Sequence, residues 1–333
     1  MTVLHLTEPG NYAIKEGRRL VVKKEGEKVA DIPVEYLEQV VVYGSNQITA
    51  PALTMLLDEN IPVFFLSFGG RFRAKLMPYT SRHVDLRLKQ YGIYLNEPER
   101  RGEIAAFLVG GKLLNCYRIL KYLNKSRCSE SLQEKGQKIL RLAGVTKKER
   151  RLPKLRGIEG AGSRVYFQAL QEVVAAEWGF DGRNRRPPRD PINALLSYGY
   201  ALLLGEVMTA VERAGFDPYL GFLHEVKYGR PALALDLMEE FRGEVDLLVL
   251  RFVNLRMATP ADFVNEEGEI SLSPGLRKKF VRHFAEKMEE ERRYDFLAKE
   301  LPLREIVALQ ARRLAGYLQG EITCYRPHRV VGG

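Results

Sequence analysis

The chain has 333 residues, 45% of them hydrophobic and 28% charged, a composition typical of a globular protein with a substantial core. Its three cysteines form no Cys-x-x-Cys pair, which argues against a disulfide framework and a cysteine zinc site and favours a reducing cytoplasm. We find neither a signal peptide nor an apolar run approaching the roughly 18 residues that span a bilayer, so we expect a cytoplasmic protein without a membrane segment.

The net charge of +10 is distributed unevenly along the chain. Residues 1–80 contain nine Lys and Arg and nine Asp and Glu, so the whole excess of positive charge lies in residues 81–333. This asymmetry indicates a neutral region joined to a region that contacts polyanions. A mildly basic cytoplasmic protein without such a partner has the same overall charge, and charge alone does not decide between the two.

The first 80 residues predict a small β-rich domain. Two runs flank Glu25-Gly26-Glu27 and predict a hairpin, and two further β-branched and aromatic runs have the length of buried strands. The segment between these further runs predicts a short helix with Thr49 as its N-cap and Pro51 in its first turn. In chain order the expected elements are the strands 19–24, 28–33 and 38–44, the helix 49–60, and the strands 61–67 and 70–78.

After about residue 80 the apolar residues recur with a period near 3.6, which predicts helices. The predicted fold is therefore α+β: a small β-rich N-terminal domain, residues 1–80, followed by a larger all-helical domain, residues 81–333. Residues 127–150 read as a charged loop or as a pair of short helices. The expected helices are 85–96, 102–123, 163–178, 193–214, 275–294 and 301–319, and the expected loops are 147–157, 179–191 and 265–271.

One candidate site lies in GFLHEVKYGRPALALDLMEEFR, residues 221–242. A helix over 233–241 would place Asp236, Glu239 and Glu240 on one face, where carboxylates repel each other unless a cation lies between them. His224 adds a nitrogen ligand, and a mixed carboxylate and imidazole site suits Mn²⁺ or Mg²⁺ better than a structural zinc. The alternative is an amphipathic helix with a solvated acidic face and a histidine in a turn.

A second candidate lies in KKERRLPKLRGIEGAG, residues 147–162. A basic run leads into the single carboxylate of Glu159, which is the arrangement expected of a metal site that binds phosphate. The alternative is a solvated loop followed by a helix with Glu159 in its first turn, where the helix dipole favours an acid.

A third stretch, RNRRPPRDPINALLSYGYALL, joins a basic, proline-rich loop to an apolar helix. Asp190 or Asn193 is suited to cap that helix. The arginines of the loop are candidates for phosphate contacts, although a flexible surface loop has the same composition. The sequence contains no Walker A, GxGxxG, GxSxG or HExxH motif, so it gives no support for the chemistry of those motifs.

These stretches occur together and in one order, and in this the chain resembles the CRISPR-associated integrase family, the Cas-one proteins. The resemblance runs nearly from end to end. Its motifs are LTEPGNYAIKEGRRLVVKKEGEKVADIPVEYLEQVVVYGSNQITAPAL, LRGIEGAGSRVYF, DPINALLSYGYALL, GFLHEVKYGRPALALDLMEEFR and LQARRLAGYL.

The resemblance implies roles for particular residues. Glu159, His224 and Glu239 match the three metal ligands, with Mn²⁺ or Mg²⁺ as the ion. Asp236 matches a second acid of the catalytic site, which supports the ligands, and Arg242 matches a basic residue beside it. Glu240 has no implied role. With the basic loops, the residues expected to bind DNA are Lys154, Arg156, Arg183, Arg185, Arg186, Arg189, Lys227, Arg230 and Arg242.

The resemblance also implies an activity. The family inserts short DNA fragments, the new spacers, into a CRISPR array by attack of a 3′-hydroxyl on a phosphodiester, and it cleaves DNA, notably branched DNA. It forms a homodimer through the N-terminal domain, bridged by a small partner, Cas-two. Two alternatives remain open: a branched-DNA repair nuclease or transposon-borne integrase of the same fold, and a DNA-binding scaffold without catalysis.

Overall fold

A computed structural model describes residues 2–68, 72–77, 83–184, 187–294 and 296–330. The strand-rich part contains two sheets of four strands each, with the orders β1-β5-β7-β8 and β4-β3-β2-β6. In the first sheet β1, β5 and β7 are parallel and β8 is antiparallel. The strands are β1 (Thr2–Leu6), β2 (Asn11–Glu16), β3 (Arg19–Lys24), β4 (Glu27–Pro33), β5 (Leu37–Tyr43), β6 (Gln47–Ile48), β7 (Val63–Leu66) and β8 (Phe72–Leu76).

The first sheet joins the two parts of the molecule, because its two faces belong to different cores. Val40 and Val42 of β5 pack with α1 (Ala50–Asp58) in the core of the strand-rich part. Val41 and Tyr43, which point to the other face, pack in the core of the helical part. Alternate side chains of β5 thus point into two different cores. Because both faces of the strand are buried, β5 holds the strand-rich part against the helices.

The predicted N-terminal elements are confirmed. β3 and β4 form the predicted hairpin, and Glu25 and Gly26 in its turn both have positive φ, as a tight hairpin turn requires. Thr49 lies at the N-cap position of α1, but its side chain makes no capping hydrogen bond. The strands β1, β2 and β6 were not predicted, and the predicted boundary at residue 80 falls outside the described residues.

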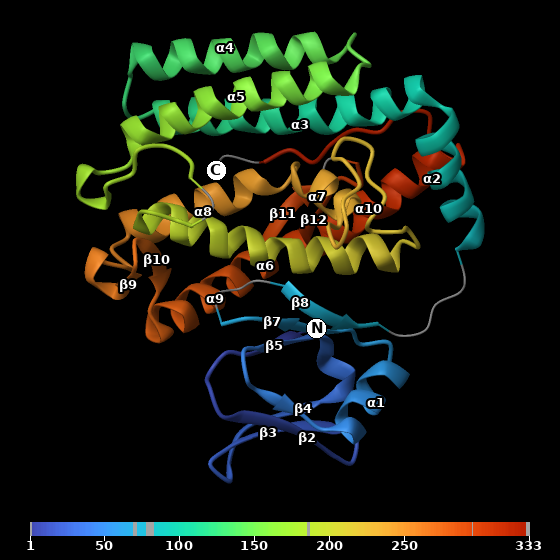
Figure 1. Ribbon diagram of the computed structural model, residues 1–333, viewed down its shortest axis with the longest axis vertical. Helices are drawn as coiled ribbons and strands as arrows, with labels where there is room; N and C mark the ends of the chain where they lie inside the picture. The colour runs from blue at the N-terminus through green and yellow to red at the C-terminus, as the bar shows by residue number, and fades with distance from the viewer. Residues whose placement is uncertain (1, 69–71, 78–82, 185–186, 295, 331–333) are drawn as a thin grey trace.

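The helical part is arranged in layers (Figure 1). The long helices α3, α4 and α5 pack together at the end farthest from the strand-rich part, and α6 runs between α7 and α8 on one side and the first sheet on the other. The helices are α2 (Val84–Asn96), α3 (Pro98–Asn124), α4 (Glu130–Thr146), α5 (Leu152–Val173), α6 (Pro191–Arg213), α7 (Ala232–Met238), α8 (Arg242–Asn254), α9 (Pro274–Glu289) and α10 (Leu303–Gln319).

Several predictions for this part need correction. Residues 130–146 form the single long helix α4, and α5 begins at Leu152, so most of the predicted loop 147–157 has helix in place of coil. The predicted loop 265–271 is a hairpin of β9 (Phe263–Glu266) and β10 (Glu269–Leu272). The predicted helix 275–294 ends at Glu289, and a hairpin of β11 (Glu291–Tyr294) and β12 (Lys299–Pro302) follows. The part of the chain that follows β8 is therefore mainly, but not wholly, helical.

Helix α6 corrects a second expectation. An 18-residue window within it has a mean hydropathy of 1.5, so by length and composition this helix could cross a membrane. In the fold, 83% of that window is buried inside the protein. The predicted helix 193–214 is thus confirmed, and its apolar character is that of a central core helix surrounded by α7, α8 and α10.

Candidate active site

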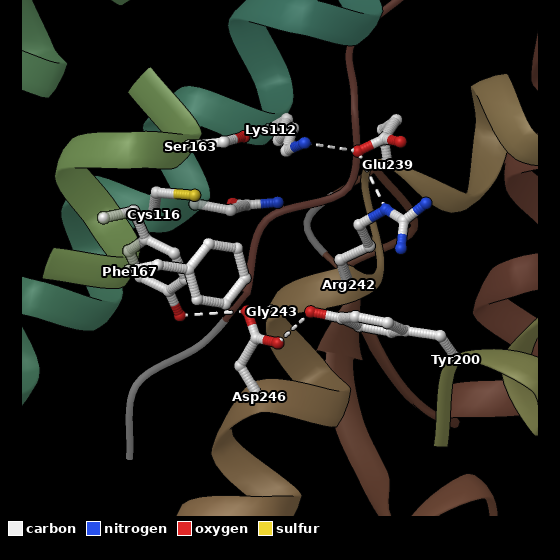
Figure 2. Close-up of a pocket in the computed structure, with 11 residues that line it drawn as sticks. Lys112, Cys116, Ser163, Phe167, Tyr200, Glu239, Arg242, Gly243 and Asp246 are labelled. Atoms are coloured by element: carbon white, nitrogen blue, oxygen red, sulfur yellow. Dashed lines mark hydrogen bonds and ion pairs between the residues drawn. The ribbon is translucent and has the colours of Figure 1, made fainter. Parts of the chain in front are cut away.

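Carboxylates from two distant segments meet around a lysine of α3. Lys112 Nζ contacts the carboxylate of Glu159, which lies in the second turn of α5, and lies 2.7 Å from Glu239 Oε2. Arg242, the first residue of α8, approaches the same oxygen with its Nε at 2.9 Å. Figure 2 shows Glu239 between the side chains of Lys112 and Arg242. Glu239 is 4% exposed and Lys112 8%, whereas Glu159 is 25% exposed, so the cluster opens toward solvent at Glu159.

The glycine at position 162 explains how α5 brings Glu159 to α3. A β-carbon on Gly162 would lie 2.2 Å from the side chain of Leu113, so any larger residue here would force that side chain to shift. Gly162 follows Glu159 by three residues and Leu113 is the neighbour of Lys112. The close approach of the helices therefore occurs next to the ion pair.

The loop between α6 and α7 folds around the buried carboxylate of Asp236. Its oxygens accept hydrogen bonds from the backbone amides of Phe222, Leu223 and His224, at 2.5, 2.9 and 2.9 Å. The Nδ1 atom of His224 lies 2.6 Å from the same carboxylate. A β-carbon on Gly221 would lie 2.7 Å from Asp236 Oδ2, so glycine is needed where this loop passes over the carboxylate. Asp236 thus shapes the loop that carries His224.

The imidazole of His224 completes the site. Its Nδ1 is held by Asp236, and its Nε2 lies 4.0 Å from Glu239 Oε1. The side chain is 23% exposed. A histidine held in this way by a carboxylate presents its other nitrogen as a potential metal ligand.

The charges of the cluster act strongly on one another. Burial would raise the pKa of Glu239, but the charges of Arg242 and Lys112 outweigh burial and hold the pKa of this carboxyl well below its ordinary value. Burial would likewise lower the pKa of Lys112, but Glu239 and Glu159 raise it above its ordinary value. Glu239 and Lys112 therefore both carry their charge at neutral pH.

Within the part of the chain that the structure describes, no three His, Cys, Asp or Glu side chains are close enough to hold a metal ion together. The donor set nevertheless fits a divalent cation. Glu159 and Glu239 already share a cation, the ammonium of Lys112, and His224 Nε2 is directed to Glu239. Oxygen ligands with one imidazole nitrogen are a set that suits Mn²⁺ or Mg²⁺.

Glu240 departs from the expectation that the three acids share one face. Helix α7 ends at Met238, and the chain turns before α8 begins at Arg242. The Glu240 carboxylate therefore points into a different buried cluster, where it accepts hydrogen bonds from Tyr325 Oη, from Gln310 Nε2 at 2.8 Å and from His328 N at 2.7 Å. Burial raises its pKa.

The residues expected to bind DNA fall into two groups. Arg156, Arg183 and Arg242 bond within the protein: Arg156 to Leu223 O and Glu225, Arg183 to Asn193 and Ser197, and Arg242 to Glu239. Lys154, Arg189 and Lys227 are exposed and Arg230 is partly exposed, while Arg185 and Arg186 lie outside the described residues. Asp190, a predicted cap, does accept the Asn193 amide at 2.8 Å at the start of α6.

Sequence reasoning missed Lys112 and a carboxylate beneath it. Asp246 is buried and bonds the hydroxyls of Tyr166, at 2.9 Å, and Tyr200 (Figure 2). It lines a cavity of about 20 Å³ together with Lys112 and Glu239. A signal was present in both cases, because a lysine inside the apolar run LVGGKLL and an aspartate inside EVDLLVL must each find a buried partner.

Acidic and imidazole side chains around a cation, beside exposed lysines and arginines, are features expected of a protein that acts on polyanionic substrates. A family model for "CRISPR associated protein Cas1" matches residues 4–286, and the chain therefore belongs to the Cas1 family, the Cas-one family of the resemblance.

Comparisons with individual proteins agree with this membership. The chain is 39% identical over 322 residues to a CRISPR-associated endonuclease Cas1 of Thermus thermophilus, covering 95% of this chain and 96% of the relative. A Cas4 exonuclease/Cas1 endonuclease fusion of Geobacter sulfurreducens is 35% identical and matches 97% of this chain, which spans 59% of the length of that protein. Among solved structures, a casposase bound to an integration product aligns with a TM-score of 0.86 and 26% identity, over 98% of this chain and 93% of that chain.

Proposed function

We propose that this chain is the integrase of CRISPR adaptation, a metal-dependent DNA endonuclease and strand-transfer enzyme that inserts short DNA fragments into a CRISPR array. The observation that carries the proposal is the meeting of Glu159 and Glu239 around one cation, with His224 Nε2 4.0 Å from Glu239, in a chain of the Cas1 family. These residues come from three separate segments. Charged side chains of a solvated surface gain little from being gathered in one place, so their convergence favours a functional site.

The three residues Glu159, His224 and Glu239 would hold Mn²⁺ or Mg²⁺. When bound, the ion polarises the scissile phosphodiester and offsets the charge that develops on its oxygens. Asp236 acts through His224: it fixes the ring so that Nδ1 is engaged and Nε2 remains available. Arg242 balances the buried charge of Glu239.

The exposed cations Lys154, Arg189 and Lys227 are our candidates for contacts to the DNA backbone, with Arg230 beside them. Lys154 precedes Glu159 on the same helix, and Lys227 follows His224 in the same loop. Contacts of this kind bind phosphates without reading sequence, so affinity should fall steeply with salt.

We also propose a homodimer through the strand-rich part, bridged by a small Cas2-type protein. One solved relative is a Cas6-RT-Cas1–Cas2 complex, of which a chain aligns with a TM-score of 0.85 and 25% identity over 99% of this chain and 36% of that one. This chain matches two Cas1 relatives over 97% and 96% of their own length. That agreement favours the adaptation integrase over a repair nuclease or a transposon-borne integrase. The three free cysteines suit a reducing cytoplasm.

Strand transfer tests the proposal. A labelled duplex with free 3′-hydroxyl ends is incubated with a supercoiled plasmid that carries a leader and repeat, with Mn²⁺ or EDTA and with or without the Cas2-type partner. Glu159→Gln removes a carboxylate of the site, and Glu172→Gln on the exposed side of the same helix is the matched control. We expect label in the plasmid with wild type and Glu172→Gln, and none with Glu159→Gln or EDTA. No transfer by wild type under any condition, with DNA still bound, contradicts the proposal.

A further inference from the structure

Lys112 is a buried charge in the middle of α3. Its side chain is 8% exposed, and its Nζ contacts carboxylates from two elements, Glu159 of α5 and Glu239 after α7. Ser163 Oγ donates to the same Glu159 oxygen at 2.9 Å. Burying an ammonium is unfavourable unless it is paired, and here two separate pairs stabilise it. Lys112 therefore links the two segments that supply the acids of the site.

The two carboxylates that contact Lys112 are already paired with cations. Two cations, Lys112 and Arg242, face two carboxylates, Glu159 and Glu239. A divalent cation between the same carboxylates would add two positive charges to a buried site. Because like charges at this distance repel strongly in a partly buried environment, one of the resident cations has to withdraw when the ion binds.

The two resident cations differ in their freedom to move. The guanidinium of Arg242 lies over the ring of Tyr200, with 4.6 Å between Cζ and the ring centroid, and its residue begins α8. Lys112 ends in a flexible four-carbon stem with a compact ammonium. Both side chains line the cavity of about 20 Å³, which is large enough for a compact ammonium, about the size of a water molecule, but not for a guanidinium. Lys112 is thus the cation that can retract.

We propose that Lys112 is a built-in counter-ion that holds Glu159 and Glu239 together before metal binds and competes with the metal for both carboxylates. The inference rests on the proposed metal site. It makes Lys112 a positioning residue with a signed effect: its charge stabilises the metal-free protein and weakens the binding of the divalent cation. If Lys112 had only a structural role, its removal would lower both the stability of the metal-free protein and the affinity for the divalent cation.

Calorimetric titration of the DNA-free protein with Mn²⁺ tests this inference, with Tm measured in EDTA and in saturating Mn²⁺. The variants are Lys112→Met, Lys112→Arg, which keeps the charge, and Lys121→Met, an exposed lysine of the same helix. We expect Lys112→Met to bind Mn²⁺ at least about tenfold more tightly than wild type and to have a lower Tm that Mn²⁺ restores. Lys112→Arg keeps the charge on a larger head that cannot retract in the same way, so it should bind Mn²⁺ no more tightly than wild type, and Lys121→Met should bind as wild type does.

The outcomes separate the two proposals. Wild type that binds no Mn²⁺, or binds it as tightly after Glu159→Gln, contradicts the metal site itself. Wild type that binds through Glu159, with equal or weaker binding by Lys112→Met, contradicts the role of Lys112 alone. If Lys112→Met does not fold, the side-chain ¹⁵N resonance of Lys112 in wild type is followed during Mg²⁺ titration, with Lys112→Arg giving its assignment. A shift that saturates with the metal supports retraction, and an unchanged resonance at saturation overturns it.

Discussion

Asp236 and His224 form a pair in which the buried carboxylate oxygen Oδ1 lies 2.6 Å from the ring nitrogen Nδ1. The same carboxylate accepts the backbone amide of His224 at 2.9 Å, so both the ring and the backbone of this residue are fixed by one side chain. Because Nδ1 is engaged, Nε2 is the nitrogen that faces Glu239. The orientation of the imidazole therefore depends on an acid that is itself fully buried.

Asp236→Asn should show how far metal binding by His224 depends on the orientation of its ring. The amide keeps the size of the side chain but loses the charge and one acceptor oxygen, so the ring of His224 is no longer held. We expect strand transfer and Mn²⁺ affinity to fall by about 10- to 100-fold, as is typical when the partner of a metal-binding histidine is lost. Calorimetry and the plasmid assay measure the two effects, with the exposed Asp85→Asn as control. Unchanged Mn²⁺ affinity in Asp236→Asn would count against this role.

Gly162→Ala should disturb the contact between α3 and α5. The added methyl group would meet Leu113 at 2.2 Å, and overpacking of this kind costs about 1–3 kcal/mol. Gly160→Ala is the matched control, since nothing lies within 4 Å of a β-carbon there and alanine favours a helix by about 0.5–1 kcal/mol. Urea unfolding measures both. In a Leu113→Ala background, Gly162→Ala should cost little further stability, because the methyl group then enters the space that Leu113 leaves; the full cost in that background would reject the steric explanation.

The buried Asp246 predicts a pH dependence of stability. Burial raises its pKa from 3.8 to about 6, although hydrogen bonds from Tyr200 and Tyr166 oppose the rise. The folded protein thus holds this proton more tightly than the unfolded chain, and the associated stability is present below about pH 4 and lost as the pH rises through about 6. Relative to Asp246→Asn, wild type should lose about 2 kcal/mol of unfolding free energy between pH 4 and pH 7. Urea unfolding across this range provides the measurement, and a difference that is constant with pH contradicts the prediction.

Tyr325→Phe should destabilise the fold without altering the surface. The variant removes the hydroxyl that donates to the buried carboxylate of Glu240, which costs about 1–3 kcal/mol. Thermal unfolding measures the loss, and Tyr36→Phe, an exposed tyrosine of the strand-rich part, should leave Tm unchanged. A Tm for Tyr325→Phe equal to that of wild type would indicate that this hydrogen bond contributes little.

The exposed and internally bonded basic residues should differ in their effect on DNA binding. Replacing Lys154 and Arg189 with alanine should weaken binding and lower the slope of log K against log salt by about two, roughly one for each lost phosphate contact. Arg183→Ala should lower the stability and leave the slope unchanged, because Arg183 bonds Asn193 and Ser197. Salt titrations by fluorescence anisotropy distinguish the two. A slope that falls only with Arg183→Ala would reverse the assignment.

The sequence predicted the elements that have a clear period. The hairpin of β3 and β4 and the apolar helix α6 follow directly from alternation and from helical spacing. The sequence alone does not decide between loop and helix for α4, because charged and polar residues outnumber its apolar ones. Packing against α3 and α5 stabilises the helix. The hairpins β9–β10 and β11–β12 are too short to show a period of two.

The acids of the candidate site could be named from their motifs, but their arrangement could not. No local pattern indicates that Glu239 and Glu240, adjacent in the chain, serve two different clusters, because the separation arises where α7 ends and the chain turns into α8. The role of Lys112 depends equally on tertiary contacts. Its partners lie 47 and 127 residues away along the chain, beyond the reach of spacing arguments.

The order of synthesis gives the cluster around Glu240 a further consequence. Its donors Tyr325 and His328 follow α10, and Pro327 packs against Gly111, the neighbour of Lys112. A nascent chain that has emerged from the ribosome only as far as α10 lacks these groups, so the buried carboxylate beside Glu239 has no complete set of partners. Domains fold as they emerge, from the N-terminus onward. The turn that carries Glu239 and Glu240 therefore completes its packing only after α10 and the residues that follow it have been synthesised.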